Sequence, residues 1–80
     1  MNVKDAVAEH FRQLCKDRKI AANTLATLSG VTPSTVYSMF DSNRRDVSMV
    51  TVKKLCDGLE ITLGEFFSAP IFDTLEQEIQ

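Results

Sequence analysis

The chain has 80 residues, enough for one domain that buries about 60% of the surface its extended form would expose. A composition of 44% hydrophobic residues with three glycines and two prolines excludes a linker or a low-complexity chain and is typical of an ordered helical protein. The apolar runs are shorter than a membrane span, and residues 1–10 lack the apolar stretch of a signal peptide. We therefore expect a cytoplasmic protein with no membrane partner.

Charge is divided unevenly along the sequence. The net charge is −2, which by itself argues against a nucleic-acid partner. Residues 1–56, however, contain nine basic and five acidic residues, a local net charge of +4, whereas residues 57–80 contain six acidic residues and no basic one. This division is compatible with a basic binding face and an acidic opposite side, and equally with an acidic tail that is merely solvated.

The first predicted helix begins after Asn2, whose side chain can cap the first turn. Apolar residues then recur at intervals of four, four and three and form a stripe along one side: Val3, Val7, Phe11 and Leu14. Lys4 falls outside this stripe. The helix is expected to end near residues 17–20, and a left-handed conformation at Lys19 would cost about 1 kcal/mol.

Residues 21–40 are typical of two short helices joined by one sharp turn. Their expected apolar faces consist of Leu25, Ala26 and Leu28 in the first helix and Val36, Met39 and Phe40 in the second. Gly30 lies where a helix can end in the left-handed conformation, and Val31 can fill the space between the two helices. Thr32 then caps the second helix, and Pro33 occupies its first position, where a missing N–H costs little.

Residues 41–47 are polar and basic and predict a loop, after which Ser48 caps a fourth helix. The apolar face of that helix is expected to consist of Met49, Val52, Leu55, Cys56 and Leu59. Thr62 and Glu65 predict a capping box that opens a short fifth helix, which Pro70 stops. The inward-facing residues of the fifth helix are expected to be Leu63, Phe66 and Phe67.

Residues 70–80 form an acidic amphipathic C-terminal tail, which we distinguish from a domain of residues 1–69. Phe72, Leu75 and Ile79 recur at helical spacing, but a helix of two turns is too short to be stable alone. The tail is therefore expected to dock on its own domain, to dock on a second copy or to fray.

The spacing of six residues resembles that of the phage-repressor/Cro-like helix-turn-helix (XRE) family: Leu25, Ala26, Gly30, Val31, Val36 and Met39. The resemblance covers residues 3–68 and implies an all-α fold, a compact five-helix lambda-repressor-like DNA-binding domain. In this family the second motif helix, here residues 32–40, enters the major groove. The family register begins the first motif helix at Ala21 or Ala22, whereas Asn23 is itself a suitable cap.

Some residues depart from the family pattern. Lys19 and Glu60 stand where relatives usually have glycine. Cys15 and Phe40 replace a common arginine–glutamate pair, so an apolar contact could replace that ion pair without weakening the fold.

The resemblance implies that a set of residues on the second motif helix faces DNA bases: Thr32, Pro33, Ser34, Tyr37 and Ser38. Hydroxyl groups can meet a donor or an acceptor, but they lack the bidentate pairing that arginine and glutamine offer. Base readout by this helix alone is therefore expected to be modest. The alternative for each side chain is a solvated helix surface.

Two further groups are candidates for backbone contacts. Asn23 and Thr24 can meet a phosphate at the start of the first motif helix, where the helix dipole favours an anion. Asn43, Arg44 and Arg45 follow the recognition helix and can reach phosphates or an adjacent minor groove. The alternatives are a simple cap at Asn23 and a solvated arginine pair.

Catalytic and metal chemistry have little support in the sequence. There is no phosphate-binding glycine loop, nucleophile elbow or paired-carboxylate motif, so we expect no enzyme. Cys15 and Cys56 form no CxxC pair, and His10 is the only histidine, so we expect buried free thiols and neither a metal nor a cofactor.

The sequence thus predicts a sequence-specific double-stranded DNA-binding protein, a bacterial or phage transcriptional repressor with no small-molecule effector. Weak base readout favours a homodimer on a pseudo-palindromic operator. We expect the dimer contact at apolar residues left over outside the core: Ile71, Phe72, Leu75 and Ile79, with any exposed part of Phe66 and Phe67. The alternative functions are a protein-interaction module or an antitoxin built on the same scaffold.

Overall fold

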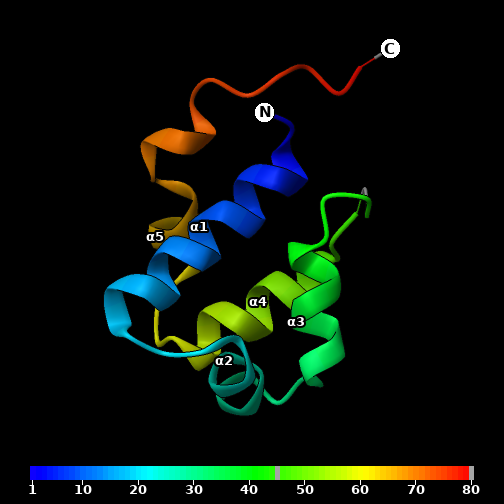
Figure 1. Cartoon of the computed structure of the whole chain (residues 1–80). Coiled ribbons are helices and arrows are strands. Elements are labelled where there is room, and N and C mark those ends of the chain that lie inside the picture. Colours follow the sequence, from blue (N-terminus) through cyan, green and yellow to red (C-terminus); the bar gives the residue numbers. More distant parts are fainter. Residues whose placement is uncertain (45, 80) are drawn as a thin grey trace.

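Five α-helices and one 3₁₀ turn follow one another in the structure, a computed structural model that describes residues 1–44 and 46–79. Their bounds are α1 Val3–Arg18, α2 Ala22–Ser29, α3 Pro33–Phe40, α4 Met49–Gly58, α5 Leu63–Phe67 and η1 Pro70–Phe72. No strand occurs in this part of the chain, and the predicted all-α, five-helix architecture is confirmed. Figure 1 shows α1 running diagonally across the molecule, with α2 and α3 forming a corner at its lower right.

The core lies where the five helices meet. α2 packs against both α3 and α4, α1 contacts α3 and η1, and α4 contacts α5. All five helices contribute buried side chains to one cluster: Val7, Ala8, Phe11, Cys15, Leu25, Ala26, Val36, Met39, Val52, Leu55, Cys56, Leu59 and Phe66. Ala26 is fully buried in this cluster, as expected for a small residue beside the corner between α2 and α3.

Side-chain caps begin four of the five α-helices, as the sequence predicts. The Asn2 side chain accepts a hydrogen bond from the Asp5 N–H at 2.8 Å, and Ser48 and Thr32 cap α4 and α3 in the same way. Thr62 and Glu65 form a complete capping box, each side chain accepting from the other's backbone N–H at 3.0 Å. These bonds satisfy N–H groups that have no partner inside the helix.

Left-handed residues follow α1, α2 and α4. Gly30 has φ 68°, and Lys19 and Glu60 have φ 57° and 58°, so both positions where the family resemblance implies glycine have the conformation that favours glycine. Val31 then packs partly buried against the core, as predicted, and its N–H donates to the Ala26 carbonyl at 3.1 Å. The sharp turn between α2 and α3 is therefore built from local signals.

Three residues predicted on apolar faces are exposed instead. Val3 is 41% exposed because the buried face of α1 passes through position 4. Met49, at the first position of α4, extends beyond the edge of the core and is 57% exposed. Leu28 is 55% exposed because the inner side of α2 turns toward α4 through Ser29.

Lys4, which was expected outside the apolar stripe of α1, is buried with 4% of its surface exposed. The buried positions of α1 include 4, 7, 8, 11 and 15, which repeat at intervals of one, three or four residues. This spacing describes one helical face, so position 4 belongs to the inner side although its residue is charged.

Gly58 allows α2 and α4 to approach closely. A Cβ atom at this position would lie 2.2 Å from Ser29 Oγ and 3.0 Å from the Leu28 carbonyl carbon. Ser29 Oγ is buried and has no hydrogen-bond partner among the described residues. The contact holds α2, and with it the corner, against α4.

The C-terminal tail does not form the helix that its apolar spacing suggests. One 3₁₀ turn ends at Phe72, whose ring centroid lies 4.9 Å from that of Phe67 and 5.5 Å from that of Phe66. Figure 1 shows the rest of the segment running past the N-terminus, where Glu76 pairs with the α-amino group at 3.0 Å. The Val3 N–H also donates to Glu78 Oε2 at 3.3 Å. Of the three predicted arrangements, the structure has the tail on its own domain.

Candidate nucleic-acid interface

α3 presents a hydroxyl-rich face to solvent. The five recognition-helix candidates are all exposed: Thr32, Pro33, Ser34, Tyr37 and Ser38. Val36 and Met39, from the opposite side of the same helix, are buried with 0% and 2% of their surface exposed. The helical repeat therefore separates the side chains that anchor α3 from those available to a ligand.

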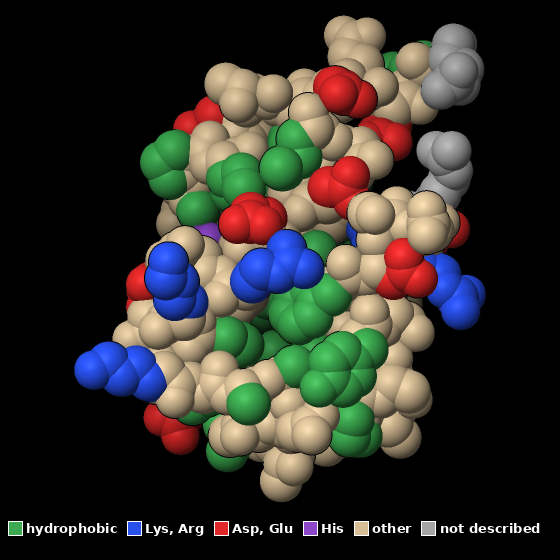
Figure 2. All heavy atoms as spheres, in the orientation of Figure 1, with side chains coloured by type: hydrophobic (Ala, Val, Ile, Leu, Met, Phe, Trp, Pro, Cys, Tyr) green, Lys and Arg blue, Asp and Glu red, His purple; other side chains and the backbone are tan. Residues whose placement is uncertain are grey.

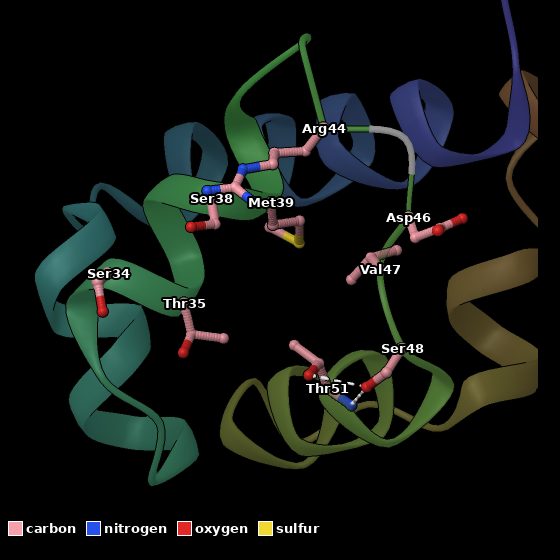
Figure 3. A pocket seen from close by; sticks show the side chains of 9 residues that line it. All are labelled: Ser34, Thr35, Ser38, Met39, Arg44, Asp46, Val47, Ser48 and Thr51. Atoms are coloured by element: carbon pink, nitrogen blue, oxygen red, sulfur yellow. Dashed lines mark hydrogen bonds between the residues drawn. The ribbon is translucent and has the colours of Figure 1, made fainter.

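A groove of about 300 Å³ lies beside this face. It is bounded by α3, by the segment that follows it and by the first turn of α4 (Figure 3). Its lining residues are Ser34, Thr35, Ser38, Met39, Arg44, Asp46, Val47, Ser48 and Thr51. In Figure 3 the Arg44 side chain extends from its loop back toward Ser38 on α3. The structure thus brings Ser34, Ser38 and Arg44 together at one groove.

Several groove residues were not predicted as site residues. Thr35, Ser48 and Thr51 add hydroxyl groups, and Asp46 adds a carboxylate. Ser48 Oγ is 3.0 Å from Thr51 Oγ1 and accepts from the Thr51 N–H at 3.0 Å. In the sequence Ser48 is recognisable only as a helix cap, because its position beside α3 depends on how α3 and α4 pack.

Thr32 serves mainly as a cap within the described structure. Its hydroxyl oxygen accepts from the Thr35 N–H at 3.3 Å and lies 2.9 Å from Thr35 Oγ1 and 3.0 Å from Ser34 Oγ. This network orients the first turn of α3. A base contact by Thr32 would have to share these partners, whereas Tyr37 and Ser38 lie outside the network.

α2 is the one α-helix in the described part of the chain that begins without a side-chain cap. Its N-cap is Ala21, so of the two alternatives the cap at Asn23 is not formed, and the helix begins at Ala22, within the Ala21 or Ala22 start of the family register. Asn23 and Thr24 are exposed in the first turn. The N–H groups of this turn have no side-chain acceptor and can meet an anion.

The loop after α3 places its candidates differently. Arg44 lines the groove, whereas Asn43 is exposed but does not line it. The Asn43 N–H donates to Asp41 Oδ1 at 2.9 Å, which shapes the start of the loop. Arg45 lies outside the described residues.

Comparison with known proteins identifies the family of the fold. Residues 10–70 match the model of the Cro/C1-type HTH DNA-binding domain. The chain belongs to the Cro/C1-type helix-turn-helix family. The crystal structure of the prophage Lp1 protein 11 is similar, with a TM-score of 0.81 and 30% sequence identity over 94% of this chain and 100% of that one. No curated protein sequence matches significantly.

Membership in the Cro/C1-type family confirms the resemblance seen in the sequence and identifies a DNA-binding domain of the kind used in transcription regulation. Such domains are typically regulators and not enzymes. No helix in the described ranges is long and apolar enough to cross a membrane. The match ends at residue 70 and leaves most of the C-terminal tail outside it.

Much of the positive charge of this Cro/C1-type domain has partners inside the protein. Arg18 donates to the Leu59 carbonyl at 2.6 Å, and Lys53 pairs with Asp57. Arg12 pairs with Glu9 at 3.0 Å and lies 4.8 Å above the Phe40 ring. The Arg12 guanidinium, one turn before Cys15 on α1, therefore lies over Phe40. The predicted contact between Cys15 and Phe40 stays a prediction. Figure 2 shows acidic side chains gathered toward the C-terminal tail on one face.

Burial shapes the chemistry of the two cysteine thiols. Desolvation raises the pKa of the Cys15 and Cys56 thiols, and both are free and buried, as predicted. A raised pKa keeps these thiols protonated and weakly nucleophilic at neutral pH. Among the described residues no three His, Cys, Asp or Glu side chains are grouped as metal ligands would be.

Proposed function

We propose that this Cro/C1-type domain binds specific double-stranded DNA as a transcriptional repressor, with α3 in the major groove. The observation that supports this most is the groove beside α3, where the exposed hydroxyls of Ser34 and Ser38 lie near Arg44. Hydroxyls can read base edges, and a guanidinium can meet the backbone next to them. Occupation of a promoter by such a domain would block transcription.

Each recognition-helix residue has a distinct proposed role. Ser34 and Ser38 contact base edges. Tyr37, which is 55% exposed, lies at the edge of the contact. Thr32 holds the first turn of α3 through its hydroxyl network, and Pro33 supplies an apolar contact. Readout by hydroxyls is weaker than bidentate readout, so each base is distinguished modestly.

Phosphate contacts are proposed on both sides of α3. On one side, the uncapped first turn of α2 offers N–H groups together with Asn23 and Thr24. On the other side, the loop offers Asn43, Arg44 and Arg45, of which Arg44 lines the groove. Two anchoring points, one before and one after the recognition helix in the sequence, would fix its register on the duplex.

Salt dependence tests this assignment. Changing Arg44 and Arg45 together to alanine is expected to weaken binding to all duplexes and to make the slope of log K against log salt shallower by roughly two units. The matched control is Lys53→Ala with Lys54→Ala, which removes the same formal charge from the exposed side of α4. An unchanged slope in the arginine variant would refute the proposed anchoring.

We further propose that two copies bind a pseudo-palindromic operator whose half-sites lie about one helical turn apart. Two copies are needed because one hydroxyl-rich helix discriminates weakly against a genome of competing sites. Phe66 and Phe72 pack inside their own domain, so the predicted contact is left with Ile71 and Leu75, which are half-buried, and Ile79, which is 86% exposed. Sedimentation with and without DNA tests whether copies associate only on the duplex.

A protein-interaction module or an antitoxin is the competing proposal. Asp46 places a carboxylate in the groove, and Leu28 and Tyr37 each expose 55% of an apolar side chain on the α2–α3 corner. These features suit a protein partner. Absence of duplex binding even at low salt would favour the protein-interaction module.

A further inference from the structure

Lys4 is the one charged side chain that is buried in the described structure, with 4% of its surface exposed. It stands in the first turn of α1, and its Nζ donates to the backbone carbonyl of Asp41 at 2.5 Å. Asp41 is the residue that ends α3. One hydrogen bond therefore joins the start of the chain to the end of the recognition helix.

The Asp41 backbone carbonyl accepts a second hydrogen bond, from the Arg44 N–H at 3.0 Å. The Asp41 side chain also accepts from the Asn43 N–H at 2.9 Å. The turn that leads from α3 into the loop is thus folded around Asp41. Since Lys4 binds the same carbonyl oxygen as the Arg44 amide, it acts on the geometry of that turn.

The surroundings of Lys4 favour this bond over others. Its side chain lines a cavity of about 220 Å³ whose other walls are apolar except for Asp46, and among the described residues Lys4 forms no ion pair with that carboxylate. An ammonium group in such a place is costly without a partner, and the C-terminal end of a helix offers carbonyl groups and a favourable dipole. Movement of the turn away from Lys4 would leave the buried charge without its Asp41 partner.

We propose that Lys4 is a positioning residue for DNA binding, because it holds the end of α3 and the turn that carries Arg44. This inference rests on the proposed role of Arg44 at the backbone of DNA. Lys4 itself does not need to touch DNA. Its effect on binding passes through Asp41 to the loop.

Amide hydrogen exchange in the free protein tests the effect of the Lys4–Asp41 hydrogen bond on the turn without DNA. In Lys4→Met, which keeps the length and removes the charge, the Arg44 amide is expected to exchange about tenfold faster. The Phe66 amide, bonded to the Thr62 carbonyl at 3.0 Å in α5, is the internal control and should change much less. Lys4→Arg should restore slow exchange at Arg44. Equally faster exchange at both amides would show that Lys4 contributes only to the stability of the whole domain, and would overturn the proposal.

A double-mutant cycle then tests the link to DNA. Arg44→Ala is expected to make the salt slope shallower by about one unit when Lys4 is present and to change it little in Lys4→Met. Independent effects of the two changes would contradict positioning. If Arg44→Ala has no effect with Lys4 present, the proposed phosphate contact itself fails, and the exchange result alone reports whether Lys4 orders the turn.

Discussion

The α2–α3 corner and the C-terminal tail both show apolar residues at helical spacing, yet only the corner forms the helices that this spacing suggests. In the corner, Gly30 ends one helix in the left-handed conformation and Thr32 caps the next. In the tail, Phe72, Leu75 and Ile79 have the same kind of spacing, but the structure has one 3₁₀ turn and then extended chain.

The difference lies in what surrounds the apolar residues. The corner has a cap, a helix-stopping glycine and two neighbouring helices to pack against, so local and tertiary preferences agree. The single turn of the tail has no side-chain cap. Its Phe72 ring packs in the aromatic cluster of the domain instead of on one face of a longer helix. Apolar spacing therefore indicates a helix more reliably where start or stop signals such as Thr32 and Gly30, and neighbouring helices to pack against, accompany it.

The largest expected effect concerns the support of the corner by α4. Gly58→Ala would place a Cβ atom 2.2 Å from Ser29 Oγ and is expected to lower the free energy of unfolding by about 1–3 kcal/mol. Gly64→Ala is the matched control, because its Cβ would meet nothing closer than Thr62 Oγ1 at 3.8 Å. Urea unfolding gives the free energy of unfolding of both variants. Equal values would show that the packing of α2 on α4 does not depend on the close contact at Gly58.

The tail is tested by removing its one aromatic anchor. Phe72→Ala is expected to cost about 2 kcal/mol, roughly half the loss for a fully buried phenylalanine, because the ring is only partly buried. Ile79→Ser, at a side chain that is 86% exposed, should change stability by less than about 0.5 kcal/mol. Thermal unfolding measures the loss of stability in each variant. Similar losses in the two variants would contradict a tail that docks on its own domain through Phe72.

The sequence predicted the parts of the molecule that depend on neighbouring residues. Capping at Asn2, Ser48 and Thr62 needs only a few residues of context, and the structure agrees at each position. The family resemblance supplied the exposed face of α3 in the same way. These features are local, so spacing is enough to find them.

Contacts between distant residues were not predictable in this way. Lys4 meets Asp41 across 37 positions, and Gly58 meets Ser29 through the packing of two helices. Neither pair has a motif of its own, and a lysine on a first helical turn is usually solvated. The groove beside α3 likewise includes Ser48 and Thr51 because α4 begins there, which sequence spacing does not indicate.

The cap of the recognition helix offers a smaller test. Thr32→Ala removes the side-chain acceptor of the Thr35 N–H and is expected to destabilise the domain by about 1 kcal/mol. Thr24→Ala, at an exposed position in the uncapped first turn of α2, should be within about 0.5 kcal/mol of the parent. A loss at Thr24 as large as that at Thr32 would contradict the assigned capping role.

The smallest effect is a pH dependence at the tail. Desolvation lowers the pKa of His10 below its usual 6.5, against an opposing contribution from Asp17, and the His10 ring lies 5.7 Å from that of Phe72. The unfolded chain binds this proton more readily than the folded protein. The free energy of unfolding is therefore unaffected by His10 above pH 6.5 and falls as the pH drops below that value. Comparing melting temperatures across this range for the parent and His10→Phe tests the assignment. The variant should lose part of the dependence, and an identical profile would exclude His10 as its source.

Selection of bound sequences from random duplex DNA tests the central claim most directly. The full chain is expected to enrich a short half-site in two inverted copies about one helical turn apart, with tolerance at several positions because hydroxyls read bases weakly. Repeating the selection with Ser34→Ala and Ser38→Ala should relax the preferred bases while binding to duplexes in general persists. Recovery of no enriched sequence from the parent protein, at a salt concentration where it still binds DNA, would contradict sequence-specific recognition by α3.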